Sequence, residues 1–126
     1  MANFSVDKQD RYSVVTPSVD KLDSRVSPEL KSELVMINST GEKNIIVDLR
    51  QCKYCDSSGL SAILIGNRLC REVDGSFILS GLQESVQKLI SISQLDTVLS
   101  ITPTLDEAVQ MLYMDEIERN IDEDEE

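Results

Sequence analysis

Apolar residues gather in four short runs that are separated by longer segments of mixed polarity. Residues 12–19, "YSVVTPSV", are rich in β-branched side chains, and the runs at 45–49, 76–80 and 98–101 are short and apolar, so all four are predicted to be strands. Residues 45–49 show no polar alternation, which is typical of a central strand covered on both faces. Pro17 has no backbone N–H to donate, and it therefore indicates an edge position or a bend in the first strand.

The segments between these runs carry apolar residues at helical spacing. They predict helices over residues 28–37, 58–73 and 83–92, and a last helix that begins after Thr104. Ser27 is the expected N-cap of the first helix because a proline follows it in the first turn. The second helix has little polar surface over its first turns, so we expect it to be largely buried.

This alternation of strands and helices predicts an α/β domain in which right-handed crossovers place the helices against a mixed sheet. A chain of 126 residues with 40% apolar content is large enough to fold as one domain without disulfides or a structural metal. We assign residues 1–118 to this domain. Residues 119–126 hold too few apolar side chains to pack, and they are expected to form a disordered tail or a frayed extension of the last helix.

The charge of the chain is uneven. The formal net charge is −11, and residues 115–126 contribute −7 of it through eight acidic residues and one arginine, which leaves the rest of the chain at −4. Phosphate-rich partners would be repelled by such a surface, so neither nucleic acid nor an anionic membrane is an expected partner. A protein with a basic face is the better electrostatic match.

The residue types narrow the possible chemistry. The sequence has no histidine, which excludes Ser-His-Asp and Cys-His catalysis and His-ligated metal sites within one chain, and we do not expect an enzyme. No apolar run approaches the roughly 18 residues of a membrane span, and the N-terminus lacks the apolar core of a secretory signal, so we expect a cytoplasmic protein. The three cysteines are an odd number and are expected to be reduced thiols.

The segment "YCDSSGL", residues 54–60, lies where a predicted buried strand leads into a predicted helix. One interpretation is local: Ser57 or Ser58, or Asp56 together with a serine, caps the helix. Gly59 would then permit close packing. The other interpretation is regulatory, because a phosphate on one of these serines would be stabilised at the helix N-terminus, and its charge would repel an acidic partner.

The order of elements around DSSGL resembles the STAS domain, particularly the anti-sigma factor antagonists, over residues 45–109. The matching positions belong to a strand that ends in Asp-Leu, the DSSGL motif and the elements that follow: Asp48, Leu49, Asp56, Ser57, Ser58, Gly59, Leu60, Gly75 and Leu95. Upstream, "KLDSRVSPELKSEL" resembles the segment before the family's first helix, which places Asp23 at the family's acidic position near the switch site. The resemblance implies a STAS-like single domain with a mixed β-sheet of four to five strands and helices packed mainly on one face.

In that family a partner anti-sigma factor kinase phosphorylates the first serine after the aspartate, and a protein phosphatase removes the phosphate. By position, the resemblance implies that Ser57 is the phosphoacceptor. The unmodified chain would bind the serine kinase and so release the sigma factor that the kinase holds, without a cofactor or catalysis of its own. The implied partner-binding residues are those of the corner and the upstream loop: Asp23, Asp56, Ser57, Ser58, Gly59 and Leu60.

Three other interpretations stay open. STAS domains also serve as constitutive subunits of lipid-transport and other assemblies, in which Ser57 would be a helix cap. Cys52 and Cys55 have the C-x-x-C spacing of a zinc or redox site, but a second ligand pair is missing and Cys70 falls in a predicted buried helix, so buried thiols are preferred. A hydrolase would need a base to activate a serine, and Lys53, on a predicted loop, is only a weak one.

Overall fold

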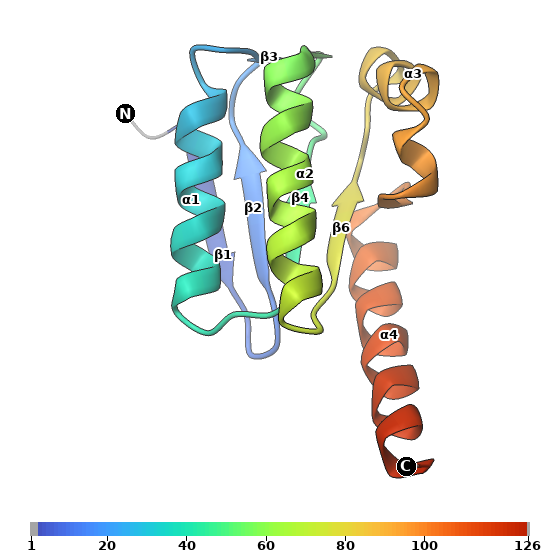
Figure 1. The fold of residues 1–126 in the computed structure, drawn as a ribbon. Coiled ribbons are helices and arrows are strands. Elements are labelled where there is room, and N and C mark those ends of the chain that lie inside the picture. Colours follow the sequence, from blue (N-terminus) through green and yellow to red (C-terminus); the bar gives the residue numbers. More distant parts are fainter. Residues whose placement is uncertain (1–2, 126) are drawn as a thin grey trace.

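Five strands form one mixed sheet at the centre of the molecule (Figure 1). The structure is a computed structural model that describes residues 3–125, with side chains as far as residue 121. The strands follow the order β1 (Phe4–Lys8), β2 (Ser13–Pro17), β4 (Ile45–Asp48), β6 (Phe77–Ser80) and β7 (Ser100–Thr102). β1 is antiparallel to β2, and the other neighbours are parallel. The predicted α/β class, with a mixed sheet of four to five strands, is therefore confirmed.

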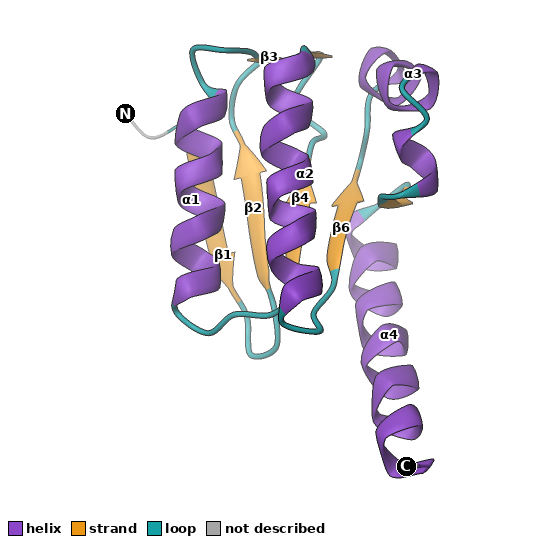
Figure 2. Cartoon of the chain, viewed as in Figure 1, coloured by secondary structure: helices purple, strands orange, loops and turns teal. Residues whose placement is uncertain are grey.

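The helices pack on the two faces of this sheet (Figure 2). They are α1 (Ser27–Ser39), α2 (Ser57–Glu72), α3 (Glu84–Ile92) with the following 3-10 turn η1 (Leu95–Thr97), and α4 (Leu105–Glu125). Successive strand residues point to opposite faces, so Ile45 and Val47 of β4 join the core of α1, α2 and α3, whereas Ile46 joins the core of α4. Most helices thus share one face, as predicted, and α4 alone covers the other.

A second, two-stranded sheet lies beside the N-termini of α1 and α2 (Figure 1). Here β3 (Lys21–Leu22) runs parallel to β5 (Tyr54–Cys55), and the backbone N–H of Asp56 donates to the carbonyl of Leu22 over 3.2 Å. Strands of two residues are too short to produce a hydrophobic period, which is why the sequence analysis missed them. This small sheet ties the loop after β2 to the loop after β4.

The strand that contains Pro17 is interior, so of the two predicted alternatives, an edge position or a bend, the edge position is wrong. β1 takes the edge instead, and the sequence analysis missed β1 because it is mostly exposed and rich in polar residues. β2 pairs with β4 only from Ser13 to Val15, so Pro17 lies beyond the end of that ladder. The missing N–H of the proline therefore removes no hydrogen bond to β4.

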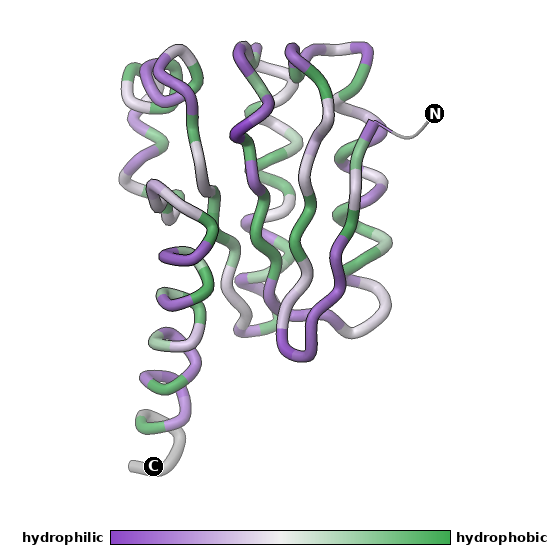
Figure 3. The backbone as a smooth tube through the Cα atoms, turned by 180° about the vertical axis from the view of Figure 1, so that it is seen from behind, coloured by the Kyte–Doolittle hydropathy of each residue, from purple (hydrophilic) through white to green (hydrophobic). Residues whose placement is uncertain are grey.

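α4 extends beyond the sheet. Its C-terminal half projects past the ends of the strands (Figures 1 and 3). The central segments of the strands are hydrophobic (Figure 3). For residues 119–126 the expectation was a disordered tail or a frayed helical extension; the structure continues α4 as a helix to Glu125, and Glu126 lies outside the described residues. Neither α4 nor any other helix of residues 3–125 is both long and apolar enough to cross a membrane.

We predict that Leu112→Ala lowers the free energy of unfolding by about 2–5 kcal/mol, because the fully buried leucine packs with Ile46 and Ile78 of the sheet. Met114→Ala on the same helix is the matched control. Its side chain is 56% exposed, so a change within about 0.5 kcal/mol is expected. Urea unfolding followed by circular dichroism measures both variants. Equal losses would mean that α4 does not pack on the sheet through Leu112.

Candidate functional site

Asp56 is the N-cap of α2. Its backbone is extended, with φ −104° and ψ −173°, and its Oδ1 accepts hydrogen bonds from the backbone N–H groups of Ser58 and Gly59 at 2.9 and 3.1 Å. These bonds satisfy two of the four N–H groups that a helix leaves free at its N-terminus. The aspartate therefore caps the helix, as one of the predicted alternatives held, and neither Ser57 nor Ser58 occupies the N-cap position. The constitutive-subunit interpretation loses the structural role that it gave to Ser57.

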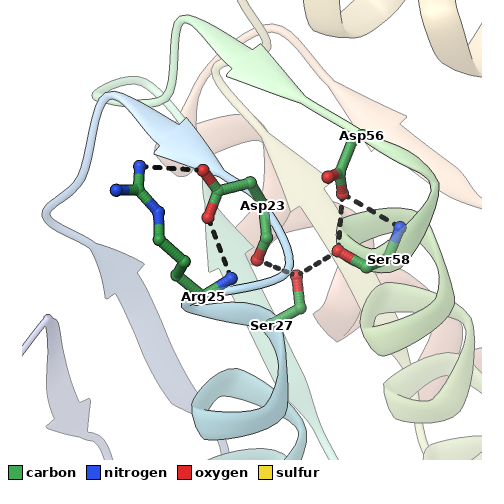
Figure 4. A network of polar contacts seen from close by, with 5 residues as sticks. All are labelled: Asp23, Arg25, Ser27, Asp56 and Ser58. Atoms are coloured by element: carbon green, nitrogen blue, oxygen red, sulfur yellow. Dashed lines mark hydrogen bonds and ion pairs between the residues drawn. The ribbon is translucent and has the colours of Figure 1, made fainter.

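A chain of short oxygen contacts joins the N-termini of α1 and α2 (Figure 4). Ser58 Oγ donates to Asp56 Oδ1 at 2.6 Å and lies 3.1 Å from Ser27 Oγ, which donates to the backbone carbonyl of Asp23 at 2.7 Å. Each hydroxyl has one proton, so two protons serve three contacts. The charged carboxylate attracts the Ser58 proton most strongly, and the contact between the two serines is then the one without a proton.

The upstream loop reaches this corner through its main chain. The carboxylate of Asp23 accepts hydrogen bonds from the backbone N–H and the guanidinium of Arg25, both at 3.1 Å, and it is the carbonyl of Asp23 that contacts Ser27 (Figure 4). Asp23 thus lies near the DSSG corner, where the resemblance placed it. Ser27 is not the N-cap of α1, because Val26 occupies that position and Ser27 is the first residue of the helix. No local sequence pattern predicts the contact between Ser27 and Ser58, because it joins two separate helices.

Ser57 is the exposed member of the corner. It is the first residue of α2, and its hydroxyl makes no hydrogen bond to another residue of the described chain. Ser58, one position later, is half-buried and bonded to Asp56. The Ser57 hydroxyl is therefore open to another protein, whereas the Ser58 hydroxyl is part of the framework that positions it.

Gly59 and Leu60 support the corner from within. A Cβ atom at Gly59 would lie 2.6 Å from Sγ of Cys55 and 2.6 Å from the carbonyl oxygen of Leu22, so only glycine lets α2 begin against the small sheet. Leu60 is 7% exposed and belongs to the main core. Both residues were grouped with the partner-binding positions, and the structure places them beneath the surface that Ser57 presents.

Two shallow hollows flank the N-terminus of α2. One, of about 400 Å³, lies between α2 and α3, and its lining includes Tyr54, Ser57, Ser85, Lys88, Leu89 and Ile92. The other, of about 360 Å³, lies between α1 and α2, and its lining includes Pro28, Lys31, Ser58 and Ile65. Tyr54 and Ile92 are 49% and 71% exposed. The contribution of α3 to this hollow was not predicted from the sequence, although Ile92 lies off the apolar face of that helix and so indicates exposure.

The two acidic residues of the corner are charged at neutral pH. The hydrogen bond from the Ser58 hydroxyl holds the pKa of Asp56 below its usual value, and the bonds from Arg25 lower the pKa of Asp23. A lowered pKa in the folded state means that the stabilisation is present above the unfolded pKa, which is about 4 for aspartate. This stabilisation is lost as the pH falls through the lower pKa that each aspartate has in the folded state.

The three cysteines are buried free thiols, as preferred from the sequence. Burial raises the pKa of Cys52 to about 11 and the pKa values of Cys55 and Cys70 each to about 12, so all three are protonated at neutral pH. Within the part of the chain that the structure describes, no group of three or more Cys, Asp or Glu residues is arranged to hold a metal ion. Core packing accounts for the positions of Cys52 and Cys55.

We predict that Asp56→Ala lowers the free energy of unfolding by about 0.5–2 kcal/mol, because two backbone N–H groups of α2 lose their acceptor. Ser57→Ala removes a hydroxyl that bonds to no described residue, so it should change stability by less than about 0.5 kcal/mol. Urea unfolding at neutral pH compares the two. A loss at Ser57 as large as that at Asp56 would contradict the assignment of the cap.

The thiols of the native chain should react slowly with Ellman's reagent at pH 8, because burial keeps all three both protonated and out of contact with the reagent. After unfolding in guanidinium chloride, all three should react within minutes. Absorbance at the wavelength of the released thiolate follows both reactions. Rapid titration of two thiols in the native chain would show that Cys52 and Cys55 are accessible, and would reopen the redox interpretation.

The chain is similar to known proteins both in sequence and in structure. The sequence profile of the STAS domain matches residues 3–108. The chain is 29% identical over 72 residues to BtrV of Bordetella bronchiseptica, a candidate anti-sigma factor antagonist, and this match spans 57% of the chain but only 62% of the length of BtrV.

Solved structures share the fold. A candidate anti-sigma factor antagonist of Thermotoga maritima superposes with a TM-score of 0.81 at 22% identity, over 87% of this chain and 94% of its own. The Bacillus protein SpoIIAA superposes in its unphosphorylated form with a TM-score of 0.69 at 19% identity, over 87% of this chain and 97% of its own. Its phosphorylated form has a TM-score of 0.67 at 21% identity, over 86% of this chain and 97% of its own. Because the profile covers most of its residues and the fold agrees, this chain belongs to the STAS domain family.

Proposed function

We propose that this chain is an anti-sigma factor antagonist that changes partners when an anti-sigma serine kinase phosphorylates Ser57 and a protein phosphatase reverses the modification. The observation that carries the proposal is the contrast between two adjacent serines. Ser58 is bonded to Asp56, whereas Ser57 is exposed and bonds to no described residue. A kinase could therefore modify Ser57 without breaking any contact that holds the corner together.

The position of the phosphate supports a change of binding rather than a change of fold. The cap carboxylate of Asp56 already accepts the N–H groups of Ser58 and Gly59, so a phosphate on Ser57 does not find them free. It stays at the surface and adds about −1.5 to −2 of charge beside a carboxylate. A partner that covers this point would then have to desolvate the dianion or approach two like charges.

The unmodified surface suits a protein partner. Beside Ser57, the hollow between α2 and α3 exposes Tyr54 and Ile92, and its charged lining residues are Asp56 and Lys88. Side chains of this kind can fill a complementary apolar contact. In the proposed cycle, the unmodified chain occupies the kinase in the cytoplasm and the kinase releases its sigma factor. The chain contributes binding only, with no cofactor and no catalysis.

We predict that Ser57→Asp lowers affinity for the kinase by about tenfold or more, because the added charge lies inside the contact. Ser57→Ala should bind as tightly as the wild type and accept no phosphate. The kinase is captured with the tagged wild-type chain, purified and incubated with each variant and ATP, and phosphate is located by mass spectrometry. Titration calorimetry gives the affinities.

Ser58→Ala and Ser61→Ala are the matched controls, since both positions lie on the first turns of α2. Phosphate should still appear at residue 57 in each of them. Phosphate on Ser58 or Ser61 in the wild type, or unchanged binding by Ser57→Asp, would contradict the proposal. Unchanged binding by all Ser57 variants is the result that a constitutive STAS subunit would give.

A further inference from the structure

The outer side of α4 carries apolar residues that are about half exposed in the described chain. Tyr113, Met114, Ile117 and Ile121 are 40%, 56%, 52% and 51% exposed. Positions 114, 117 and 121 follow the i, i+3, i+7 spacing of one helix face, and Tyr113 widens it. We refer to these four residues as the α4 stripe.

Met114, Ile117 and Ile121 lie on the side of α4 that is turned away from the body. Tyr113 borders the body, where its ring packs edge-to-face on Tyr12 with 6.2 Å between the ring centroids. Leu112 packs on the sheet from the inner side of the helix. In the following turns this inner side becomes polar: Glu116 pairs with Arg11 at 3.0 Å, and Arg119 donates to Ser76 Oγ at 3.1 Å. A surface helix normally turns its apolar side inward and its polar side to water. The last turns of α4 do the opposite, which is expected where the outward side is itself an interface.

The shape of α4 leaves the stripe accessible. The C-terminal half of the helix projects past the ends of the strands, so a partner can lie along it without meeting the sheet (Figures 1 and 3). From residue 113 to residue 121 the stripe is about 12 Å long. An amphipathic helix of a few turns, with its own apolar residues at i, i+3 and i+7, has the matching length and spacing.

Charge around the stripe selects among the possible occupants. Glu118 is exposed next to Ile117, and Asp106 and Glu107 are exposed on the first turn of the same helix, whereas Arg119 is turned to the body. Residues 122–126, which follow in the sequence, are all acidic. A second copy of the chain would bring these acidic groups against their equivalents, and an anionic membrane would repel them. A basic partner would be attracted.

We propose that the α4 stripe docks a basic amphipathic helix of another protein. The apolar face of that helix covers Met114, Ile117 and Ile121, and its lysine or arginine residues face the acidic side chains of α4, which include Glu118. The proposal does not rest on the Ser57 switch, because α4 packs on the face of the sheet opposite to α2.

A designed peptide serves as the probe. It is a fluorescein-labelled helix of about 18 residues, built from leucine and lysine with the leucines on one face, and a scrambled peptide of the same composition controls for charge alone. The full-length chain should bind the amphipathic peptide about tenfold or more tightly than the scrambled one in fluorescence anisotropy. Ile117→Gln/Ile121→Gln should lower its affinity to that of the scrambled peptide.

The matched control is Val35→Gln/Met36→Gln, which removes two residues of α1 that are 43% and 61% exposed. It should bind both peptides as the wild type does. Equal affinity for the two peptides, no binding, or the same loss in the control variant would overturn the proposal. So would a dimer in sedimentation equilibrium that Ile117→Gln/Ile121→Gln dissociates, because the occupant would then be a second copy.

Discussion

A single carboxylate oxygen holds the site together. Asp56 Oδ1 accepts hydrogen bonds from the backbone N–H groups of Ser58 and Gly59 and from the hydroxyl of Ser58, at 2.6 to 3.1 Å. The same residue donates its own N–H to Leu22 in the small sheet. Hydrogen bonds to an ionised acceptor are stronger than those between neutral groups. The first turn of α2, the loop before it and the loop after β2 are therefore fixed relative to one another, and the corner presents one geometry to a partner.

This fixed geometry explains why two neighbouring serines have different environments. Successive residues of an α-helix point about 100° apart, so a helix that begins between α1 and α3 directs one serine to each side. Ser58 lines the hollow on the α1 side, where Ser27 and Asp56 meet it. Ser57 lines the hollow on the α3 side. Had the cap been one residue later, Ser57 would itself be the cap and Ser58 would occupy the exposed first position of the helix.

The sequence predicted those parts of the fold in which one segment carries its own signal. The apolar run of β4 and the helical spacing of α2 were found to within a residue or two, because hydrophobic period depends on burial and both elements are buried. β1, β3 and β5 were missed because they are exposed or two residues long, and their pairing is tertiary. At the site, the motif identified Ser57 and Asp56. Asp56, Ser57 and Ser58 were all chemically able to cap α2, however, and only the backbone geometry selects among them. The contribution of α3 to the hollow depends on how that helix packs, and no local pattern records it.

The sheet separates the two surfaces for which partners are proposed. α2 lies on one face and α4 on the other, and the residues of β4 alternate between the two cores, with Val47 beneath α2 and Ile46 beneath α4. Coupling between distant sites requires an element with two arrangements that both sites bias. β4 is paired on both sides and buried along its whole length, so it offers no second arrangement of that kind. Partners at the Ser57 corner and on the α4 stripe would approach from opposite faces of the sheet, so they would not compete for the same surface.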